Sequence, residues 1–449
     1  MVNPRRGYGG VKAPERKELS AHAPIEDAQV PPELILFLSQ HTGAPAKALV
    51  KAGDTVKRGQ KIAEPGGPVS AALHAPASGT VKSVEARYHP ILARMVDAIV
   101  IETDGAGDAV SDLVPVGTRL DAIPKEKIVE AAREAGLVGL GGAAFPTSVK
   151  LTPPPGAAID TYLLNGAECE PYLTADQKLM EEQAEAVIFG FRALMKGAGV
   201  AKGIVCIEDN KPEAIEAMKK AMSSYGEIEL AVIPSKYPRG GEKQLIEVVL
   251  GREVPPPPGL PLNVGVIVSN VGTAYAMAQT LRTGLPLVER IVTVTGEGIT
   301  RPTNFRALIG TPVSYLIEKA GGFKGTPGKV IMGGPMMGTS LRDLNVPVLK
   351  GTSGIVVLTE EQVKAEPVLP CIRCGRCVSV CPMRLQPVWM AAYAENGFLD
   401  EAEKHRVMDC CECGTCSYVC PSRRPLVQSI RLAKAKINER RRVAAVKKG

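Results

Sequence analysis

Residues 371–382 read CIRCGRCVSVCP, and residues 410–421 read CCECGTCSYVCP. Both stretches contain the spacing C-x2-C-x2-C-x3-C-P, and together they hold nine of the eleven cysteines in the chain. Where such a run occurs twice, its first three cysteines bind one [4Fe–4S] cluster and the fourth binds the neighbouring cluster. The sequence therefore predicts two clusters. Their expected ligand sets are Cys371, Cys374, Cys377 and Cys420 for the first, and Cys410, Cys413, Cys416 and Cys381 for the second.

Zinc sites and disulfides explain these cysteines less well. Structural zinc uses paired C-x2-C knuckles rather than three evenly stepped cysteines followed by C-P. Disulfides are typical of exported proteins, and the N-terminal sequence MVNPRRGYGG lacks the apolar segment of an export signal, so we do not expect disulfides here. Cys411 is out of step with the spacing, and we expect a spare thiol near a cluster. Cys169 and Cys206 are isolated, and Cys206 is expected to be buried in a strand.

Length and composition indicate a globular protein of several domains. The 449 residues suffice for about three domains, and 45% hydrophobic with 22% charged residues is not a disordered composition. No segment provides the about 20 apolar residues that span a bilayer. With no export signal either, we expect a cytoplasmic protein that does not cross a membrane by itself.

Positive charge is concentrated at the C-terminal end of the chain. The formal net charge is +7, but residues 423–449 hold ten basic residues and one acid, so this end carries +9 and the rest −2. Such a tail is either a solvated helix end or a docking element for anionic lipid or an acidic partner. No aromatic-interleaved groove accompanies the tail, so nucleic acid is not an expected partner.

The first part of the chain is predicted to be an arm followed by a small all-β domain. Residues 1–30 are polar and proline-rich. Between residues 44 and 104, short strand-like runs are interrupted by turn signals such as Gly53 and Gly59, and the pattern occurs twice. This segment resembles lipoyl and biotinyl barrel-sandwich domains, but it has no lysine at the hairpin tip where those domains attach their cofactor. We therefore expect a structural or docking module.

Residues 120–290 alternate between helical and strand patterns, which is typical of an α/β domain with a mostly parallel sheet. A Gly-rich, β-leaning segment at 291–338 resembles the small β-grasp module of some respiratory flavoprotein subunits. The predicted fold class is multidomain α/β and β. We predict helices at 125–135, 178–196, 212–223, 273–282 and 313–320, and strands at 162–165, 204–207, 228–233 and 264–268. The predicted domains are an arm at 1–30, a barrel-sandwich domain at 31–115, a Rossmann-like α/β domain at 116–285, a β-grasp module at 286–350, a helical ferredoxin-like domain with two [4Fe–4S] clusters at 351–430, and a basic tail at 431–449.

A glycine loop at 136–150 is the first of four polar turns in the α/β region. Glycines let backbone N–H groups approach a phosphate, and Lys150 could add a positive charge. The loop is neither a G-K-[ST] loop nor a G-x-G-x-x-G fingerprint after a strand, so taken alone it is more typical of a plain tight turn than of a phosphate site. Further polar turns at 164–171, 237–244 and 269–273 follow strands or open helices, which together suggest a cofactor crevice at one edge of the sheet.

These turns resemble the flavin-binding loops of the flavin subunit of respiratory complex I. The chain departs from that pattern at several positions, with Val138 and Leu140 where arginines stand and Ala144 in place of a glycine. Gly166-Ala167 and Lys243 also differ. Over residues 5–435, the combination of parts resembles the C subunits of Rnf-type ion-translocating ferredoxin:NAD oxidoreductases.

The resemblance implies FMN as a cofactor and NAD(H) as a substrate. It also implies that electrons pass between NAD(H), FMN and the two clusters, in a peripheral subunit on the cytoplasmic face of the membrane. Membrane subunits and, indirectly, ferredoxin would be its partners. The residues implied near the FMN phosphate are Gly139, Gly141, Gly142 and Lys150. Those implied around the ribityl chain and the ring are Asn165, Glu168, Gly240, Gly241, Glu242, Asn270 and Thr273, and those implied for the nicotinamide nucleotide are Glu170 and Glu242.

Three other hypotheses remain open at this point. The chain could be the flavin and iron–sulfur subunit of a soluble NAD-dependent hydrogenase or formate dehydrogenase. It could be a non-catalytic electron relay with an unused flavin fold, or a purely structural iron–sulfur module. The five histidines lie outside all the motifs, and no Ser/His/Asp arrangement is apparent. We therefore expect electron transfer rather than acid–base catalysis.

Overall fold

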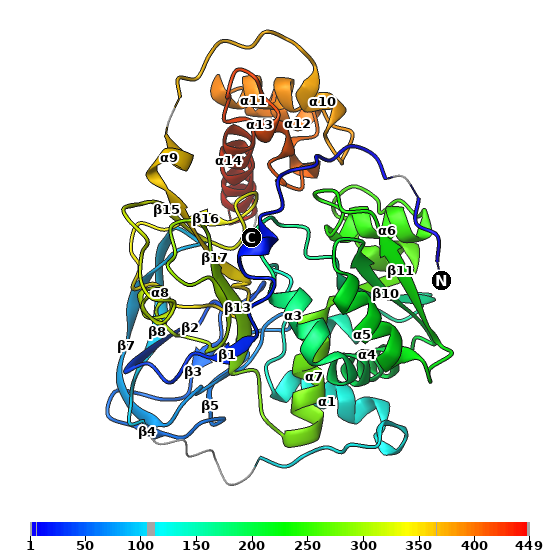
Figure 1. Ribbon diagram of the computed structural model, residues 1–449, viewed down its shortest axis with the longest axis vertical. Helices are drawn as coiled ribbons and strands as arrows, with labels where there is room; N and C mark the ends of the chain where they lie inside the picture. Colours follow the sequence, from blue (N-terminus) through cyan, green and yellow to red (C-terminus); the bar gives the residue numbers. More distant parts are fainter. Residues whose placement is uncertain (1, 6, 106–112, 365, 447–449) are drawn as a thin grey trace.

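The computed structural model describes residues 2–5, 7–105, 113–364 and 366–446. Figure 1 shows the two β-rich parts on one side, the α/β domain on the other, and the C-terminal helices at one end. Some predictions fall outside the described residues: those for residues 1 and 6 of the arm, 106–112 of the barrel-sandwich domain, 365 of the cluster domain, and Lys447, Lys448 and Gly449 of the tail.

The N-terminal β domain consists of two antiparallel sheets, with strand orders β2-β8-β7-β4 and β3-β5-β6. Strand β2 is buried on both faces. Leu34 and Leu36 point into the core between the two sheets, whereas Ile35 and Phe37 pack against the neighbouring module, as expected from alternation along a strand. The strands are β2 (Glu33–Phe37), β3 (Lys47–Ala48), β4 (Thr55–Val56), β5 (Lys61–Glu64), β6 (Leu73–His74), β7 (Gly79–His89) and β8 (Arg94–Thr103).

The α/β domain is built on a four-stranded parallel sheet of order β11-β10-β9-β12. Parallel strands buried on both faces read as continuous apolar runs, which the sequence provides at β10 and β12. The strands are β9 (Thr161–Gly166), β10 (Lys202–Glu208), β11 (Ile228–Ile233) and β12 (Val266–Asn270). The helices are η2 (Leu120–Ala122), α1 (Lys125–Glu134), α2 (Thr147–Lys150), α3 (Ala175–Glu182), α4 (Ala184–Ala198), α5 (Pro212–Met222), α6 (Glu242–Leu250), η3 (Pro261–Val264) and α7 (Val271–Thr283).

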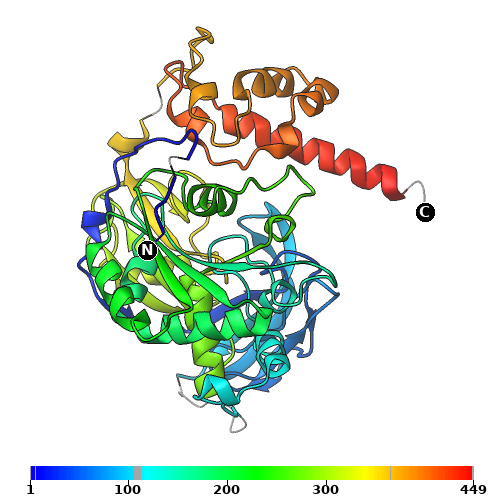
Figure 2. The same cartoon turned by 90° about the vertical axis from the view of Figure 1, so that its right-hand side faces the viewer.

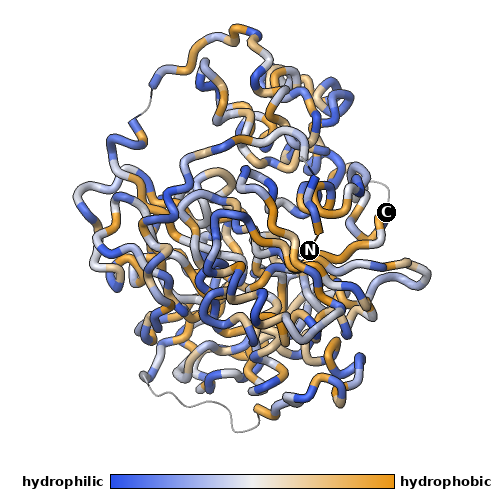
Figure 3. Tube along the Cα trace, turned by 45° about the vertical axis from the view of Figure 1, so that its right-hand side comes forward, coloured by the Kyte–Doolittle hydropathy of each residue, from blue (hydrophilic) through white to orange (hydrophobic). Residues whose placement is uncertain are grey.

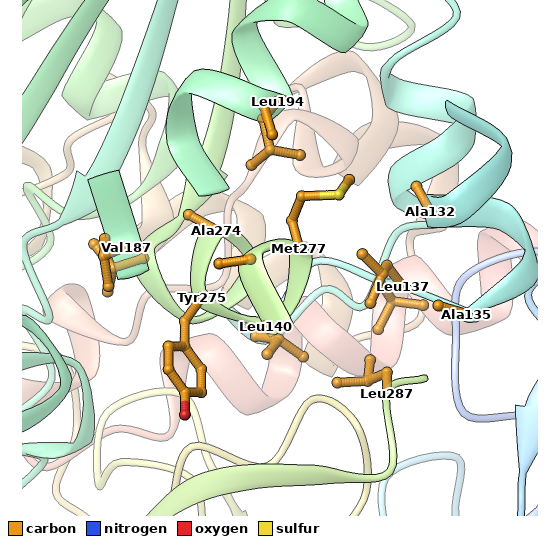
Figure 4. Close-up of a cluster of buried hydrophobic side chains, with 14 of the residues drawn as sticks. Ala132, Ala135, Leu137, Leu140, Val187, Leu194, Ala274, Tyr275, Met277 and Leu287 are labelled. Atoms are coloured by element: carbon orange, nitrogen blue, oxygen red, sulfur yellow. The ribbon is translucent and has the colours of Figure 1, made fainter. Parts of the chain in front are cut away.

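Helices cover both faces of this sheet, and α4 and α7 pack very closely on one of them (Figure 4). A Cβ atom on Gly190 of α4 would lie 1.7 Å from the carbonyl oxygen of Ala274 in α7, so only glycine allows this approach. Helix α6 covers the other face through Leu245, Ile246 and Val249. The single helix predicted at 178–196 is two helices, because the chain leaves helical geometry at Gln183.

A six-stranded mixed sheet, of order β1-β14-β13-β17-β15-β16, forms the second β module. The arm contributes β1, which pairs in parallel with β14, and β17 lies between β13 and β15. The predicted module at 286–350 therefore leaves out two strands, one assigned to the arm and one to the cluster domain. The elements are η1 (Lys17–Leu19), β1 (Ile25–Asp27), β13 (Glu289–Thr295), β14 (Thr303–Leu308), α8 (Val313–Lys319), β15 (Pro327–Met332), β16 (Thr339–Ser340), β17 (Gly354–Thr359) and α9 (Glu360–Val363).

Residues 366–446 contain short helices and one long one, and no strand is assigned in this part of the described chain. Helix α14 packs through Ile430, Ala433 and Ile437, and its last turns project away from the body (Figure 2). No helix in the described residues has the length and apolar character needed to cross a membrane. The helices are α10 (Arg376–Ser379), α11 (Pro387–Glu395), α12 (Leu399–Lys404), η4 (Val407–Asp409), α13 (Thr415–Tyr418) and α14 (Leu426–Val446).

A buried lysine joins the two β modules to the α/β domain. Lys350 is 1% exposed, and its Nζ donates hydrogen bonds to the carbonyl oxygens of Ala72 (2.8 Å) and Gly136 (2.7 Å). Its backbone N–H donates to Gln40 Oε1 at 3.0 Å. Burial lowers the pKa of Lys350 to about 7, because the ammonium loses its hydration.

We predict that Lys350→Met destabilises the fold by about 2 kcal/mol, because two buried carbonyl oxygens lose their donor. The folded-state pKa lies below that of the unfolded chain, so the unfolded chain binds the extra proton above about pH 7. The wild-type protein, but not the variant, should gain stability from this group as the pH rises. Urea midpoints at pH 6.5 and 8.5 measure this difference. Lys329→Met, at an exposed position of β15, is the control, and equal midpoints for both variants would contradict the prediction.

Candidate functional site

The glycine loop folds back on itself at the edge of the α/β domain. Val138 and Pro146 form an isolated antiparallel β-bridge, and the N–H of Gly139 donates to the carbonyl oxygen of Phe145 at 2.9 Å. Gly142 at the crest has φ +109°, a conformation that favours glycine, and a Cβ there would meet nothing within 4 Å. The crest therefore presents backbone to open space, as a phosphate-binding loop requires.

Helix α7 begins directly against this loop. The N–H of Leu140 donates to Thr273 Oγ1 at 2.9 Å, and a Cβ on Gly141 would lie 3.4 Å from Asn270 Cβ. Asn270 caps the helix by accepting from the Gly272 N–H at 2.8 Å. Within the described residues, the N–H of Gly141 donates no hydrogen bond. A free N–H beside the N-terminus of a thirteen-residue helix is a favourable place for an anion.

Lys150, Asn165, Gly240 and Glu242 lie together at the edge of the sheet where the crevice is predicted. Lys150 Nζ lies 2.7 Å from the carbonyl oxygen of Val268 and 3.4 Å from Glu242 Oε1. Asn165 Nδ2 donates to the carbonyl oxygen of Gly240 at 2.8 Å. These contacts bring three separate turns together, as the predicted edge of the sheet requires.

The remaining predicted positions lie beside these groups. Asn165 and Asn270 face each other in the register of β9 and β12, so both turns leave the same edge of the sheet. Gly241 precedes the first residue of α6, Glu242, as its N-cap.

The carboxylates of Glu168 and Glu170 both accept hydrogen bonds from backbone N–H groups of neighbouring elements. The carboxylate of Glu168 accepts from the N–H groups of Asp176 (2.8 Å) and Gln177 (3.1 Å), at the N-terminus of α3. That of Glu170 accepts from the N–H groups of Met336 (3.0 Å) and Met337 (2.8 Å) in the mixed-sheet module. Burial raises the pKa of Glu170 to about 7. Both side chains thus tie the wall of the crevice to neighbouring elements.

A buried lysine from the arm supports the same wall, and sequence reasoning missed it. Lys17 Nζ donates to the carbonyl oxygens of Glu168 (2.9 Å), Glu170 (3.1 Å) and Leu173. Burial lowers the pKa of this ammonium. The polar, proline-rich context gives no sign that this lysine is buried, so only the folded arm reveals its role.

The cysteines of the second predicted set lie together. Cys381, Cys410, Cys413 and Cys416 line one small cavity together with Cys411, so the last cysteine of the first run lies beside the cysteines of the second run. All eleven cysteines are free thiols. Burial raises the pKa of Cys410 to about 11 and that of Cys416 to about 12, so iron binding at these thiols displaces protons. Thiols from both runs beside one cavity are the type of donor that an iron–sulfur cluster requires.

The first predicted set lies further out. Cys377 and Cys420 are half-buried and pack in one group with Leu426 and Val427, whereas Cys371 and Cys374 are exposed. Among the described residues, no three metal-ligating side chains close around a single point. We refer to the set of Cys381 as the inner thiol set and to that of Cys371 as the outer thiol set.

The two cysteine runs have the same backbone conformation. Arg373 and Glu412 occupy equivalent positions and have φ +55° and +59°, and Gly375 and Gly414 precede equivalent one-turn helices. The N–H of Arg373 donates to Cys371 Sγ at 3.4 Å, and that of Glu412 to Cys410 Sγ at 3.3 Å. The repeated motif thus produces a repeated loop that aims N–H groups at sulfur.

Tyr237 connects the crevice with the inner thiol set. It is buried, and its hydroxyl donates to the carbonyl oxygen of Cys413 at 2.8 Å. The same turn carries Gly240 and Gly241 of the crevice. Tyr237 stands in a turn that the sequence singles out, but nothing in the pattern indicates that its hydroxyl reaches a cysteine loop.

Two further cysteines lie in this contact region. Cys169 and Cys411 both pack in the group formed by Val11, Tyr237 and Cys413. A hydrogen bond with the Cys411 side chain lowers the pKa of Cys413. Cys206 is fully buried in β10.

Models of four protein families match the chain. They are the Nuo51 FMN-binding domain (residues 132–279), the RnfC barrel sandwich hybrid domain (6–106), the SLBB domain (291–340) and the 4Fe-4S dicluster domain (364–421). The match to the FMN-binding domain includes the glycine loop and all three other turns of the crevice. The match to the dicluster domain includes both cysteine runs.

The chain is similar over nearly its full length to the C subunits of three ion-translocating complexes. It is 48% identical to that of the Na(+)-translocating ferredoxin:NAD(+) oxidoreductase complex of Acetobacterium woodii, covering 97% of each chain. It is 45% identical to that of the proton-translocating ferredoxin:NAD(+) oxidoreductase complex of Clostridium ljungdahlii, covering 95% of this chain and 93% of the other. It is 44% identical to that of the ion-translocating oxidoreductase complex of Rhodobacter capsulatus, with 96% and 83% covered.

A solved NAD+-reducing [NiFe]-hydrogenase chain in the H2-reduced state shares the fold. The TM-score is 0.50 at 19% identity, with 74% of this chain and 69% of that chain covered.

The shared cavity of the inner thiol set leads to a prediction about iron content. Cys381→Ser should disrupt the cluster of the second run, because a ligand from the first run is lost. Iron should fall from about eight toward about four per chain. Cys411→Ser is the matched control and should retain about eight irons. Iron and sulfide analysis with EPR on anaerobically prepared protein measures both. Loss of the same cluster in both variants would contradict the assignment of Cys411 as a spare thiol.

Proposed function

The chain belongs to the family of C subunits of ion-translocating ferredoxin:NAD(+) oxidoreductase complexes, and from this membership we propose that its crevice and two thiol sets form one path for electrons. It is an oxidoreductase subunit that functions in electron transport, with FMN and two [4Fe–4S] clusters as cofactors and NAD(H) as substrate. The observation that carries the proposed path is the Tyr237 hydrogen bond, which joins the crevice turn to the loop of the inner thiol set.

The residues around the crevice are proposed to contact different parts of FMN and of the nicotinamide nucleotide. Gly139, Gly141 and Gly142 are proposed to present backbone to the FMN phosphate, with Lys150 and the N-terminus of α7 supplying positive charge. Glu242 is proposed to face the nicotinamide nucleotide, since its side chain is 42% exposed. Glu168 and Glu170 are proposed to position the wall between the flavin and the inner thiol set. The proposed contacts to the ribityl chain and the ring come from Asn165, Gly240, Gly241, Asn270 and Thr273.

These residues do positioning rather than acid–base chemistry. FMN, when bound, exchanges two electrons with a nucleotide and one electron at a time with a cluster. The chain's own contribution is to hold a phosphate at Gly141 and Lys150, and to fix the 237–242 turn against Cys413. Cys381, Cys413 and Cys416 are each no more than 7% exposed, which limits the access of water to three of the four inner thiols.

The positions of the thiol sets support an order for the path. The inner set contacts the crevice turn through Tyr237, whereas the outer set includes the exposed Cys371 and Cys374. We therefore propose that the inner cluster exchanges electrons with the flavin and the outer cluster with the rest of the complex. The family membership disfavours a soluble hydrogenase or formate dehydrogenase subunit, because the hydrogenase likeness extends only to the fold.

We also propose a location, partners and domain folds for the chain. The chain is proposed to lie on the cytoplasmic face as a peripheral component, bound to membrane subunits and linked through them to ferredoxin. The C-terminal domain is proposed to be a helical two-cluster domain, and the central domains Rossmann-like and β-grasp. The proposed domain limits remain 31–115, 116–285, 286–350 and 351–430, with β1 and β17 added to the third domain's sheet.

The basic tail is bound largely to its own domain. Glu412 pairs with Arg431 (3.1 Å) and Lys434 (2.5 Å), and Arg440 pairs with Asp400 at 2.6 Å. Arg441 and Arg442 also have acidic partners, at 2.7 and 2.9 Å. Only the projecting, solvent-facing side of α14 is therefore proposed to dock to anionic lipid or an acidic partner.

We predict that Lys150→Ala weakens FMN binding about tenfold or more, because a charge-assisted contact to phosphate is lost. Lys202→Ala is the matched control. Lys202 is the first residue of β10, so it lies at the amino ends of the strands, away from the proposed phosphate site at their carboxyl ends. Titration of the apoprotein with FMN, followed by flavin fluorescence, measures the dissociation constants. Equal constants for the two variants would remove Lys150 from the phosphate site, and a wild-type flavin that NADH cannot bleach would overturn the proposed function.

The tail leads to a second prediction. Lys436→Glu/Arg442→Glu reverses two exposed charges and leaves the buried Ile437 in place. Sedimentation with vesicles of one-third phosphatidylserine should show at least about a thirtyfold weaker association than for the wild type, since two basic residues are lost at about 1 kcal/mol each. Unchanged sedimentation would eliminate the tail as a lipid-docking element.

A further inference from the structure

The two cysteine runs differ at two positions between their predicted ligands. Cys411 of the second run stands where the first run has Ile372. Thr415 stands where the first run has Arg376. Both first-run residues are exposed, on the arch that leads from α9 into α10 at the far end of the molecule (Figure 1, Figure 3). Thr415, in contrast, is the first residue of α13 and is only 1% exposed, and a hydroxyl buried this deeply needs a hydrogen-bond partner.

The partner of the Thr415 hydroxyl is a sulfur atom. Thr415 Oγ1 lies 3.3 Å from Cys413 Sγ, and it forms no other hydrogen bond within the described part of the chain. As a cluster ligand, Cys413 is a thiolate and has no proton to donate. The hydroxyl of Thr415 is therefore the donor, and the sulfur of Cys413 is the acceptor.

Cys411 is a second donor to the same sulfur. Its side chain is hydrogen-bonded to that of Cys413, and it lines the same cavity as the inner thiol set. Because Cys411 lies outside the predicted ligand spacing, it keeps its proton and donates it toward the Cys413 thiolate.

The outer thiol set lacks donors of this kind. Backbone N–H groups reach sulfur in both runs, at 3.4 Å for Cys371 and 3.3 Å for Cys410. Among the described residues, however, no side chain donates a hydrogen bond to a sulfur atom of the outer set. The side-chain donors at Cys413 are therefore what distinguishes the second copy of the motif from the first.

Such donors matter most where water is scarce. A [4Fe–4S] cluster that takes up one electron becomes more negative, and its sulfur atoms share this charge. At the outer set, water and the exposed Arg373 and Arg376, which form no ion pair among the described residues, stabilise the added charge. The inner ligands Cys381, Cys413 and Cys416 are no more than 7% exposed. Burial therefore lowers the reduction potential of the inner cluster, whereas hydrogen bonds to sulfur raise it, and a surrounding of low polarity strengthens them.

We propose that Thr415 and Cys411 set the reduction potential of the inner cluster, by donating hydrogen bonds to the Cys413 sulfur that offset its burial. Both are positioning residues, since neither binds iron and both act through Cys413. The proposal rests on the proposed ligand set of the second run. Without these donors the inner cluster would be harder to reduce, which would oppose each of the two electrons that NADH delivers one at a time through the flavin.

The test measures both reduction potentials in the full chain with its clusters assembled anaerobically. Dithionite reduces mediator dyes, each cluster gains one electron from a dye that is thereby oxidised, and EPR follows both clusters. Thr415→Val removes the hydroxyl and keeps nearly the same shape. At the potential where the wild-type inner cluster is half reduced, its ratio of reduced to oxidised form should fall about tenfold in the variant, a shift of about 59 mV for one electron. The ratio of the outer cluster should change less than twofold.

Conservative variants separate the donor from the side chain that carries it. Thr415→Ser keeps the hydroxyl and should restore the wild-type ratio within twofold. Cys411→Ala should lower the ratio several-fold, and Cys411→Ser should restore it. The matched control is Ser417→Ala, which removes a hydroxyl of the same helix that accepts from the Val427 N–H at 3.0 Å and does not bond to sulfur. It should leave both potentials unchanged.

Iron analysis keeps cluster loss apart from a change in potential. Each variant should retain about eight irons per chain, because no ligand is removed. If Thr415→Val assembles less iron, Cys411→Ala decides the question by the same titration.

Two outcomes would overturn the proposal. One is a wild-type inner potential in every variant that lacks a donor and retains its iron. The other is an equal shift in Thr415→Val and Thr415→Ser, or in Ser417→Ala, since the shift would then not depend on a donor to sulfur. Failure of the proposed ligand set is distinct from both, because Cys413→Ser would then retain both clusters and the full iron content.

Discussion

The contact between Tyr237 and the loop of Cys413 is the constraint on which the rest of the structure depends. Electron transfer between a flavin crevice and a cluster requires the carboxyl edge of the sheet to lie against the cysteine loop. The arm completes this contact, because Val11 pairs with Tyr237 and the Gly10 N–H donates to the carbonyl oxygen of Val380 at 2.8 Å. A Cβ on Gly10 would lie 2.5 Å from the Tyr237 carbonyl oxygen, so the GYGG segment is required by a close backbone approach.

The same contact region explains an unusual amount of buried charge. Glu208 and Lys211 form an ion pair of 3.0 Å that is almost completely buried, and Lys17 is buried beside them. Such pairs rarely add net stability, because desolvation offsets the attraction. Lys17 instead satisfies three carbonyl groups of the 168–173 segment, which otherwise would be buried without donors. The ammonium group of Lys17 therefore fixes the conformation of the 168–173 segment rather than adding to the stability of the core.

The sequence predicts what depends on local patterns and misses what depends on distant contacts. Cysteine spacing predicts the inner thiol set, because the motif states which residues share a cavity. Apolar runs predict the strands of the parallel sheet within a few residues. In contrast, β1 and β17 join a sheet through partners far away in the chain, and no local pattern reports such pairing. Glu170 stands in a ligand-like motif, yet its carboxylate accepts hydrogen bonds from the N–H groups of Met336 and Met337, which lie far away in the chain.

The two cysteine loops show how surroundings separate two copies of one motif. Arg373 and Glu412 adopt the same left-handed backbone and direct their N–H groups to equivalent sulfur atoms. Glu412, however, is held by Arg431 and Lys434 of α14, and its loop is buried against Tyr237. Arg373 has no such partner among the described residues, and its loop faces solvent. Mostly buried ligands and paired charges around one cluster, against exposed ligands and free cations around the other, give two chemically identical cubes different environments. The helix that follows the second run, rather than the runs themselves, thus creates the difference between an inner and an outer cluster.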